Sequence, residues 1–410
     1  MKFLKVQTLE EASSRLFEVS KDWLFKKEVV ELDESPSLIL AEDVVSEENL
    51  PSFRRSTVDG FAVKSAETAA ASESTPVFLK LVGDVKVGEK ATRSLQNGEC
   101  MEVATGAMIP DGADSVVMVE YTENFGLNEI AVHRAAANMQ AIVDIGDDIA
   151  KGEVVLKKGK RVTPYDIGAM AAIGCTKVAV WKKLKITLVS TGDELVGIGE
   201  SPELGKIRDI SSHSLRAFAH SLGMEVLDVF RLEDDDKLIE STIKDALGTN
   251  DIIVVSGGSS YGKQDLTASI IDRISTPGVF THGLAIKPGK PTILGADEAT
   301  RTLIIGLPGH PVSSLIVFKK LMDSLFERNL GFVDRLIVQA ELVCNIPSDE
   351  GKLTIYPCTI AKDRDRYLAE PIFGKSALIS TLTKTDGYFT VEETLEGLEA
   401  GSVVDVHLFR

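Results

Sequence analysis

The sequence predicts a multidomain α/β protein in which a central α/β domain with a mostly parallel sheet is accompanied by smaller domains. Apolar strand candidates alternate with helical stretches across residues 184–326, and such alternation produces βαβ units with helices on both faces of a sheet. Short β-like runs separated by glycines fill residues 51–140, and strands with turns return after residue 328. A chain of 410 residues also exceeds one ordinary hydrophobic core.

The chain opens with a predicted helix over residues 7–27. Apolar residues recur there at helical spacing, and Glu10 and Glu11 make the first turn acidic. A helix at Pro164–Ile173 and a strand at 177–181 are expected to pack back against the first 50 residues. The predicted domains are residues 1–50 with 141–180 as a discontinuous N-terminal domain, 51–140 as a small β domain, 181–328 as the α/β domain, and 329–410 as a C-terminal β domain.

Composition and charge exclude several functional classes. The formal net charge of −17 argues against nonspecific nucleic-acid binding, which depends on clustered Lys and Arg. No stretch is apolar enough to cross a bilayer, and the N-terminus lacks the apolar core of a signal peptide. The four cysteines are scattered without CxxC pairs, which is typical of a reducing compartment. We therefore expect a cytoplasmic protein with neither a membrane nor a nucleic acid as partner.

Three loops follow predicted strands of the α/β domain, where open α/β sheets bind their ligands. They are Ser-Thr-Gly-Asp-Glu at 190–194, Ser-Gly-Gly-Ser-Ser-Tyr-Gly at 256–262, and Gly-Leu-Pro-Gly-His-Pro-Val-Ser at 306–313. The second loop suits an anion, because glycines let backbone N–H groups turn toward one point before a helix N-terminus. The alternatives are a tight connection for this loop and, for Pro308 and Pro311, a rigid turn with Pro311 at the first helical position.

Charged residues beside these loops suggest a site for an anion and a cation. The segment Lys-Pro-Gly-Lys-Pro at 287–291 carries Lys287 and Lys290 on a short, stiff turn, and an anion needs such local positive charge in an acidic chain. Solvated surface lysines are the alternative. Carboxylates suit Mg²⁺, whereas no histidine cluster with zinc-ligand spacing is present. The carboxylates that could converge at the strand ends are Asp193, Glu194, Asp209 and Asp265, and a helix N-cap is the alternative for Asp265.

Seven motifs in order resemble the molybdopterin molybdenumtransferase (molybdenum insertase) family, which includes the C-terminal domain of gephyrin. Each motif is moderately specific, and their order along nearly the whole chain is the stronger signal. The motifs are LPSFRRSTVDGFAV (50–63), ATGAMIPDGADSVVMVE (104–120), STGDEL (190–195), GKIRD (205–209), SGGSSYGKQD (256–265), AIKPGKP (285–291) and GLPGHPVSS (306–314).

The resemblance implies an elongated homodimer of four-domain subunits, in which the discontinuous N-terminal domain serves dimerisation. It implies that adenylylated molybdopterin and molybdate react to give molybdenum cofactor and AMP, with a divalent cation such as Mg²⁺. A molybdopterin adenylyltransferase is a candidate contact. The site would lie between the α/β domain of one subunit and the small β domain of the other, so that Asp59 comes from the partner chain.

The residues that fall on the family's active-site motifs are given the following roles by the resemblance. The catalytic residues are Asp59, Asp193, Asp265, Lys287 and Lys290, of which Asp193 and Asp265 would also hold the metal. The cofactor-binding residues are Thr105, Glu120, Thr191, Gly192, Ser256, Gly257, Gly258, Pro308, Gly309 and Pro311.

The sequence also departs from the family pattern. The family's Asn-Ser-Ala-Met-Asp-Gly is Arg-Ser-Thr-Val-Asp-Gly at 55–60, and an arginine-rich stretch is Val-Asp-Ile-Gly-Asp-Asp at 143–148. Asp-Ser-Asn is Asp-Ile-Ser at 209–211, and Gly-Asn-Pro is Gly-His-Pro at 309–311. A non-catalytic scaffold or binding protein on the same fold and a tungsten-handling paralogue are the alternatives. The two additional β domains argue against a molybdopterin adenylyltransferase.

Overall fold

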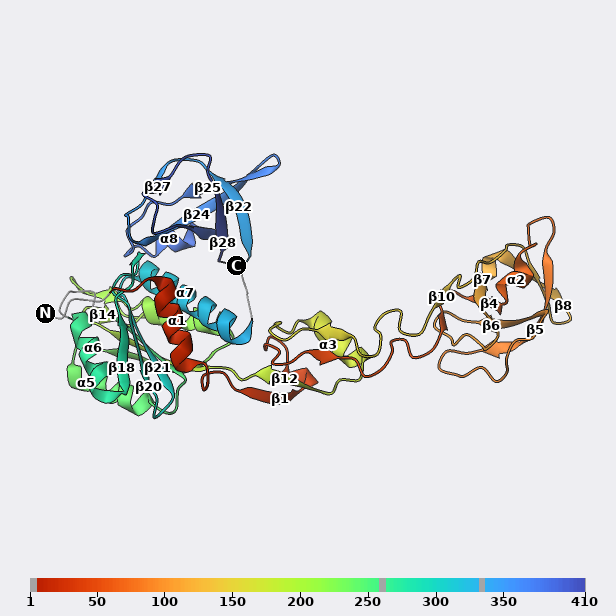
Figure 1. Ribbon diagram of the computed structural model, residues 1–410, viewed down its shortest axis with the longest axis horizontal. Helices are drawn as coiled ribbons and strands as arrows, with labels where there is room; N and C mark the ends of the chain where they lie inside the picture. The colour runs from red at the N-terminus through yellow and green to blue at the C-terminus, as the bar shows by residue number, and fades with distance from the viewer. Residues whose placement is uncertain (1–5, 258–262, 332–335, 410) are drawn as a thin grey trace.

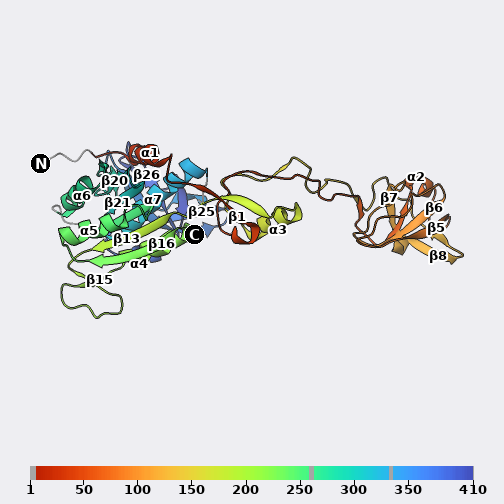
Figure 2. The ribbon, with the colours of Figure 1, turned by 90° about the horizontal axis from the view of Figure 1, so that it is seen from below.

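The computed structural model describes residues 6–257, 263–331 and 336–409, with the helical backbone alone for 263–265. The molecule is elongated (Figure 1). An α/β region and a C-terminal β region form a large body at one end, a slim middle region follows, and a small β region lies at the far end (Figures 1 and 2). No helix among the described residues is both long enough and apolar enough to cross a bilayer.

The α/β region is a six-stranded sheet in the order β16-β13-β17-β21-β20-β18. The first four strands in this order are parallel to one another. Strand β20 pairs antiparallel with β21, and β18 pairs antiparallel with β20. The sheet is covered on both faces because alternate strand residues enter two hydrophobic cores. Leu188 and Val254 pack in one core with residues of α4 and α7, and Val189 and Ile253 pack in the other with residues of α5 and α6.

The strands of this sheet are β13 (Lys185–Thr191), β16 (Glu225–Leu232), β17 (Ile252–Gly257), β18 (Pro277–His282), β20 (Ile293–Asp297) and β21 (Thr302–Leu307). The helices are α4 (Ser211–Ser221), α5 (Asp236–Ala246), α6 (Lys263–Ile274) and α7 (Pro311–Leu330). The short strands β14 (Leu195–Val196) and β15 (Ile207–Arg208) form a separate pair. The predicted mostly parallel sheet, with helices on both faces, is confirmed.

Helix α1 (Leu9–Ser20) is shorter than the predicted helix, and it packs on the α/β region instead of joining the predicted N-terminal domain. Thr8 and Glu11 form a capping box at its start. Its buried residues Ala12 and Leu16 join the core of the α/β region together with α7, so α1 lies on that region and not on the middle one (Figure 1). The chain then runs on to β1 (Lys27–Glu31), which pairs antiparallel with β12 (Lys177–Trp181).

The middle region is built from two separate stretches of the chain, whereas the small β region is formed by one continuous stretch. The middle region contains β1, β12, η1 (Leu32–Glu34), β2 (Val44–Val45), β11 (Val154–Leu156) and α3 (Pro164–Ala172). The small β region contains α2 (Ser65–Thr68), η2 (Val119–Tyr121) and the sheet of β7 (Ser115–Met118), β4 (Gly60–Val63), β6 (Glu99–Val103), β5 (Val77–Val85), β9 (Glu129–Val132) and β8 (Thr122–Gly126). Strands β3 (Arg55–Ser56) and β10 (Ile142–Val143) pair where the two regions meet.

The C-terminal region is a β sheet that takes one strand from the α/β region. Strand β19 (Ile286–Lys287) pairs parallel with β24, with Lys287 opposite Thr354. This pairing fixes the C-terminal region against the α/β region. The other elements are β22 (Ile337–Leu342), β23 (Ile346–Pro347), β24 (Leu353–Asp363), β25 (Arg366–Pro371), α8 (Ser380–Thr383), β26 (Gly387–Val391), β27 (Gly397–Leu398) and β28 (Val403–Leu408).

Candidate active site

The carboxyl ends of three neighbouring strands meet at one edge of the α/β sheet. Thr191 at the end of β13 lies opposite Gly257 of β17, and Ser256 lies opposite Leu307 at the end of β21. The three loops singled out in the sequence therefore leave the sheet side by side. Strand β20 begins at this same edge, with Ile293 opposite Gly306, so the 287–291 turn that precedes it also lies here.

Gly257 shows how closely the first two loops approach each other. Its φ is +148°, and a Cβ added there would lie 2.2 Å from Thr191 Oγ1 and 2.3 Å from the Thr191 carbonyl oxygen. Any larger residue would push the two strand ends apart, so the sequence needs glycine at this position. Thr191 and Ser256 are buried beside it. The continuation of the loop, including Gly258, lies outside the described residues.

Asp193 lies at the end of β13, where carboxylates gather. Its Oδ1 accepts a hydrogen bond from the Asp234 backbone N–H at 3.0 Å, and the Asp193 N–H donates to Asp234 Oδ2 at 3.4 Å. Glu194 folds its carboxylate against Gly192. Within the part of the chain that the structure describes, no group of three or more His, Cys, Asp or Glu side chains is arranged to hold a metal ion.

The other two carboxylates of the predicted cation site differ in position. Asp209 is buried, and its Oδ1 accepts hydrogen bonds from Ser190 Oγ and the Ser212 N–H, both at 3.1 Å. It therefore holds the start of α4 against β13. Asp265 is the third residue of α6, which begins at Lys263, so it lies inside the helix and not at its N-cap. The Asp265 side chain lies outside the described residues, and its pairing with Asp193 stays a prediction.

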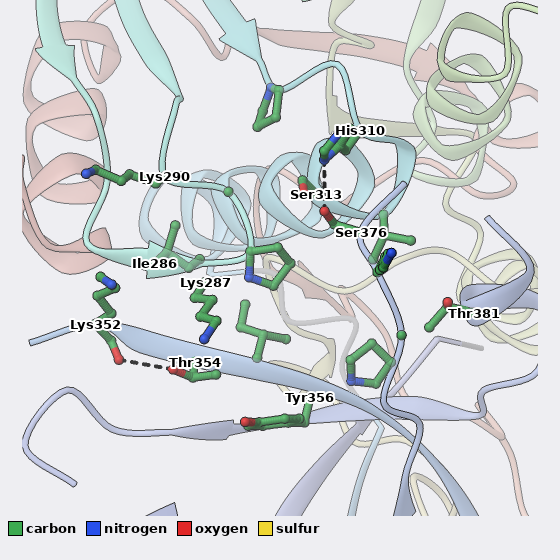
Figure 3. A pocket seen from close by; sticks show the side chains of 18 of the residues that line it. Ile286, Lys287, Lys290, His310, Ser313, Lys352, Thr354, Tyr356, Ser376 and Thr381 are labelled. Carbon is green, nitrogen blue, oxygen red and sulfur yellow. Dashed lines mark hydrogen bonds between the residues drawn. The ribbon is translucent and has the colours of Figure 1, made fainter. Parts of the chain in front are cut away.

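A pocket of about 560 Å³ lies between the α/β region and the C-terminal region (Figure 3). Four lysines line it: Lys287, Lys290, Lys352 and Lys375. Lys287 Nζ lies 3.0 Å from Asp349 Oδ2, and Lys352 Nζ lies 3.3 Å from the same oxygen. Hydrogen bonds from Lys287 and then from Lys352 hold the pKa of Asp349 below its ordinary value. The pocket therefore concentrates positive charge within an acidic chain.

The turn at 287–291 places its two lysines differently. Gly289 has φ +120°, and a Cβ there would lie 2.3 Å from Val317 Cγ2, so the turn is pressed against α7. Lys287 points toward the strand that carries Thr354 and Tyr356, whereas Lys290 leaves the turn in another direction (Figure 3). Of the two predicted lysines, Lys287 has the closer contact with the C-terminal region.

The start of α7 forms another wall of the pocket. Pro311 is the first residue of this helix, which confirms the interpretation of Pro311 as a helix-starting proline. Ser376 of the C-terminal region contacts this helix start twice, through its Oγ, 2.9 Å from His310 Nδ1, and through its carbonyl oxygen, which accepts from the Val312 N–H at 3.2 Å. Ser313 is 4% exposed and lines the pocket, and its hydroxyl makes no hydrogen bond to any residue that the structure describes.

The remaining predicted site residues form a second cluster in the small β region. Asp59 Oδ1 accepts hydrogen bonds from the Thr105 N–H at 2.7 Å and from Thr105 Oγ1 at 3.0 Å. These two hydrogen bonds, the backbone one first, hold the pKa of Asp59 below its ordinary value. The Val119 N–H donates to the Asp59 carbonyl oxygen at 3.1 Å, which places Glu120 beside them. This cluster is at the opposite end of the molecule from the lysine pocket (Figure 1).

The structure thus sorts the predicted residues into two groups and adds others. The sheet-edge loops, Lys287, Pro308 and Pro311 gather at the large end, and Asp59, Thr105 and Glu120 gather at the small end. Sequence reasoning singled out the start of α7 through Pro311 and the 306–313 loop, but it missed the residues contributed by the C-terminal region. They are Asp349, Lys352, Tyr356, Lys375 and Ser376.

Comparison with known proteins agrees with this architecture. Three family models match in chain order: the MoeA N-terminal region (domain I and II) over residues 7–174, the probable molybdopterin binding domain over 187–328, and the MoeA C-terminal region (domain IV) over 339–409. Together they account for nearly the whole chain.

Individual relatives match over their full length. A molybdopterin biosynthesis protein of Methanocaldococcus jannaschii is 31% identical over 100% of both chains, and the molybdopterin molybdenumtransferase of Haemophilus influenzae is 32% identical over 98% of both. A crystal structure of the molybdopterin biosynthesis MoeA protein of Pyrococcus horikoshii matches with a TM-score of 0.83 and 34% identity, covering 99% of this chain and 100% of that one. The chain therefore belongs to the MoeA family of molybdopterin molybdenumtransferases.

Proposed function

We propose that this protein is a molybdenum insertase, which transfers molybdate into adenylylated molybdopterin and gives molybdenum cofactor and AMP. Its membership of the molybdopterin molybdenumtransferase family supports a transferase activity in this pathway. The observation that carries the proposal is the lysine pocket. In a chain of net charge −17, four lysines line one cavity beside the sheet edge where α/β folds bind ligands.

The pocket can hold an oxyanion through charge and hydrogen-bond donors together. Lys287 and Lys352 are already oriented by Asp349, which keeps their ammonium groups near one point. The Ser313 hydroxyl and the N-terminal end of α7 add donors and partial positive charge at the same wall. Such preorganised groups stabilise negative charge without rearranging during the reaction, which is the main requirement when phosphate and molybdate groups meet.

We also propose that Mg²⁺ takes part in the reaction. Mg²⁺ is commonly held by one or two carboxylates together with substrate phosphate oxygens. Asp193 fits this role, since it is exposed at the sheet edge and only its Oδ1 accepts a hydrogen bond from a described residue. Asp265 is the second proposed ligand. A bound cation would offset the phosphate charge of the substrate while Lys287 and Lys352 hold the oxyanion.

The placement of Asp59 supports a homodimer. Asp59, Thr105 and Glu120 lie at the end of the molecule away from the lysine pocket, so one chain alone does not bring them to it (Figure 1). In a dimer the small β region of one subunit would cover the pocket of the other. We further propose that the protein works in the cytoplasm, where its four free cysteines would stay reduced, and that it receives its substrate from a molybdopterin adenylyltransferase.

AMP release tests the proposed reaction directly. Purified protein is incubated with adenylylated molybdopterin, Mg²⁺ and either molybdate or tungstate, and AMP and the cofactor are measured. We expect AMP release that depends on the oxyanion and on Mg²⁺. Binding of the nucleotide-bearing pterin without AMP release would instead indicate a non-catalytic scaffold. Release with tungstate alone would identify a tungsten-handling enzyme.

A further inference from the structure

A second lysine-lined pocket lies at the amino-terminal ends of β13 and β17, at the opposite end of these strands from the candidate active site. It has a volume of about 190 Å³ and is lined by residues from three segments of the chain, at 24–26, 182–185 and 248–251. Strand β13 starts at this pocket with Lys185 and ends at the candidate active site with Thr191. A strand of seven residues spans on the order of 20 Å, so the two pockets are separate.

The pocket has a braced backbone. Lys26 precedes β1, and its carbonyl oxygen accepts a hydrogen bond from the Lys182 N–H at 2.8 Å. The Lys185 N–H donates to Asp251 Oδ2 at 2.8 Å, and the Asp251 N–H donates to the Lys185 carbonyl oxygen at 2.9 Å. Leu24 and Leu184, which belong to the same segments, are buried. The lysine side chains therefore start from fixed positions and not from mobile ends of the chain.

The charge of this pocket is unbalanced. Lys26, Lys182, Lys183 and Lys185 line it, and their ammonium groups make no ion pair or hydrogen bond with any residue that the structure describes. Asp251 is the acidic residue of the lining, so four lysines and one aspartate give a formal charge of +3. In a chain of net charge −17, lysines have many carboxylates available as partners. Four lysines without such partners around one cavity therefore create a local positive potential that would attract an anion.

We propose that this pocket binds a free tetrahedral oxyanion of the phosphate, sulfate or molybdate type. Its volume is below the roughly 300–1,000 Å³ of pockets for drug-sized ligands, whereas a small oxyanion with part of its hydration shell fits. The lysines supply charge-assisted donors. An anion held here would bridge the chain segments at Lys26 and at Lys182–Lys183, which connect the α/β region to the middle region.

Binding stoichiometry in the full-length protein tests this proposal. Molybdate and, separately, phosphate are titrated by equilibrium dialysis against the wild type, the double variant Lys182→Gln/Lys183→Gln and the active-site variant Lys287→Gln. We expect two oxyanions per chain in the wild type. The double variant should lose the second site, with affinity there falling about tenfold or more, and Lys287→Gln should keep it. Because Lys182 and Lys183 are outside the candidate active site, a failure here leaves the proposed function intact.

Matched controls exclude a general charge effect. Lys86→Gln/Lys90→Gln removes the same charge from exposed lysines of the small β region and should bind oxyanion as the wild type does. A tungstate-soaked crystal should show an anomalous peak among Lys26, Lys182 and Lys183. Equal oxyanion binding by the wild type and the Lys182→Gln/Lys183→Gln variant would overturn the proposal. An unchanged oxyanion stoichiometry in this double variant together with weaker self-association would also overturn it. That result would make the lysines an interface between copies of the chain.

Discussion

The lysine pocket beside Lys287 and the cluster around Asp59 lie at opposite ends of the molecule and carry opposite charge (Figure 1). The pocket is a cavity lined by cations, and its carboxylate, Asp349, is engaged by Lys287 and Lys352. Asp59 is exposed, and its carboxylate is kept ionised by hydrogen bonds from Thr105. The two groups are thus chemically complementary, which supports a site that is complete only when two subunits meet.

Mixing two inactive variants gives the largest expected effect. Asp59→Asn removes the anionic group of one end, and Lys287→Ala removes a cation of the other, so each variant alone should lose most of its AMP release. If the site is shared between subunits, a mixed dimer contains one site with both residues intact. Equal mixing should restore about a quarter of wild-type activity, since half of the dimers are mixed and each has one intact site of two.

Subunits have to exchange before this complementation is measured. Co-expression of the two variants with different affinity tags allows the mixed dimer to be purified. Mixed dimers that stay as inactive as each parent would show that Asp59 and Lys287 act in the same chain or in no common site. Asp59→Asn mixed with wild type provides the reference for the dilution of active subunits.

Lys287→Ala alone should weaken binding of molybdate at the active-site pocket about tenfold or more. The lost charge-assisted contact is worth on the order of 1.5–3 kcal/mol. The loss should shrink at high salt, because screening already weakens the attraction in the wild type. Stability should change little, since Lys287 and Asp349 are both substantially exposed, at 53% and 46% of their side chains. Titration at two salt concentrations together with thermal unfolding checks this, and an equal loss at both concentrations would contradict it.

Lys290→Ala is the matched comparison for Lys287→Ala. Lys290 leaves the turn in another direction, and no ion pair is found for it among the described residues (Figure 3). We therefore expect a smaller loss of affinity than for Lys287. A larger loss at Lys290 would mean that the ligand binds on the sheet-edge side of the turn and not beside the C-terminal region.

Asp193→Asn should raise the Mg²⁺ concentration needed for half-maximal AMP release, with a moderate loss at saturating Mg²⁺. The substitution keeps the size of the side chain and its hydrogen bond from the Asp234 N–H, and it removes one charge from the proposed cation site. Glu203→Gln, at an exposed position between β14 and β15, serves as a control for general loss of negative charge. If both variants show the wild-type Mg²⁺ dependence, the cation is held elsewhere.

Much of the fold could be predicted from the sequence, because the relevant patterns are local. Alternating strands and helices predict the α/β region, and the strand-end loops meet at one edge because parallel strands share a direction. The C-terminal half of the pocket could not be predicted. Lys352 and Ser376 reach the pocket through the pairing of β19 with β24 and through the contact with His310, and residues so distant in sequence give no local signal.

Helix α1 and the 287–291 turn also show that local sequence patterns do not predict contacts between distant segments. The helical spacing of residues 7–27 predicts an apolar face but not the core that this face joins, and Leu16 packs with α7 of the α/β region. The two lysines of the turn are close in sequence and yet diverge, because the pairing of β19 with β24 fixes Lys287 opposite Thr354. Local patterns predict elements, and long-range pairing decides which side chains meet.

Asp349→Asn should strengthen oxyanion binding by several-fold. The Asp349 carboxylate is held ionised by Lys287 and Lys352 and competes with an incoming anion for the same two ammonium groups. Removing its charge frees both lysines while keeping a side chain of the same size. The pKa of Asp349 lies below its ordinary value, so the wild-type protein should show no such gain between pH 5 and pH 8, where the carboxylate is ionised. Weaker binding in Asp349→Asn would show that Asp349 serves mainly to position the lysines.

The smallest expected effect concerns Arg55, where the sequence departs from the family pattern. Arg55 lies directly opposite Val143 in the pairing of β3 with β10. Val143 begins the stretch where the family pattern implied by the resemblance has arginines. A guanidinium on either strand would lie near the same place between the small β and middle regions. Arg55→Asn should therefore lower AMP release by a few-fold, and adding Val143→Arg should restore it. Val143→Arg in the wild-type background, with both arginines present, is the control. A double variant no more active than Arg55→Asn would show that the two positions are not interchangeable, and that the loss of the arginine-rich stretch has no compensation at Arg55.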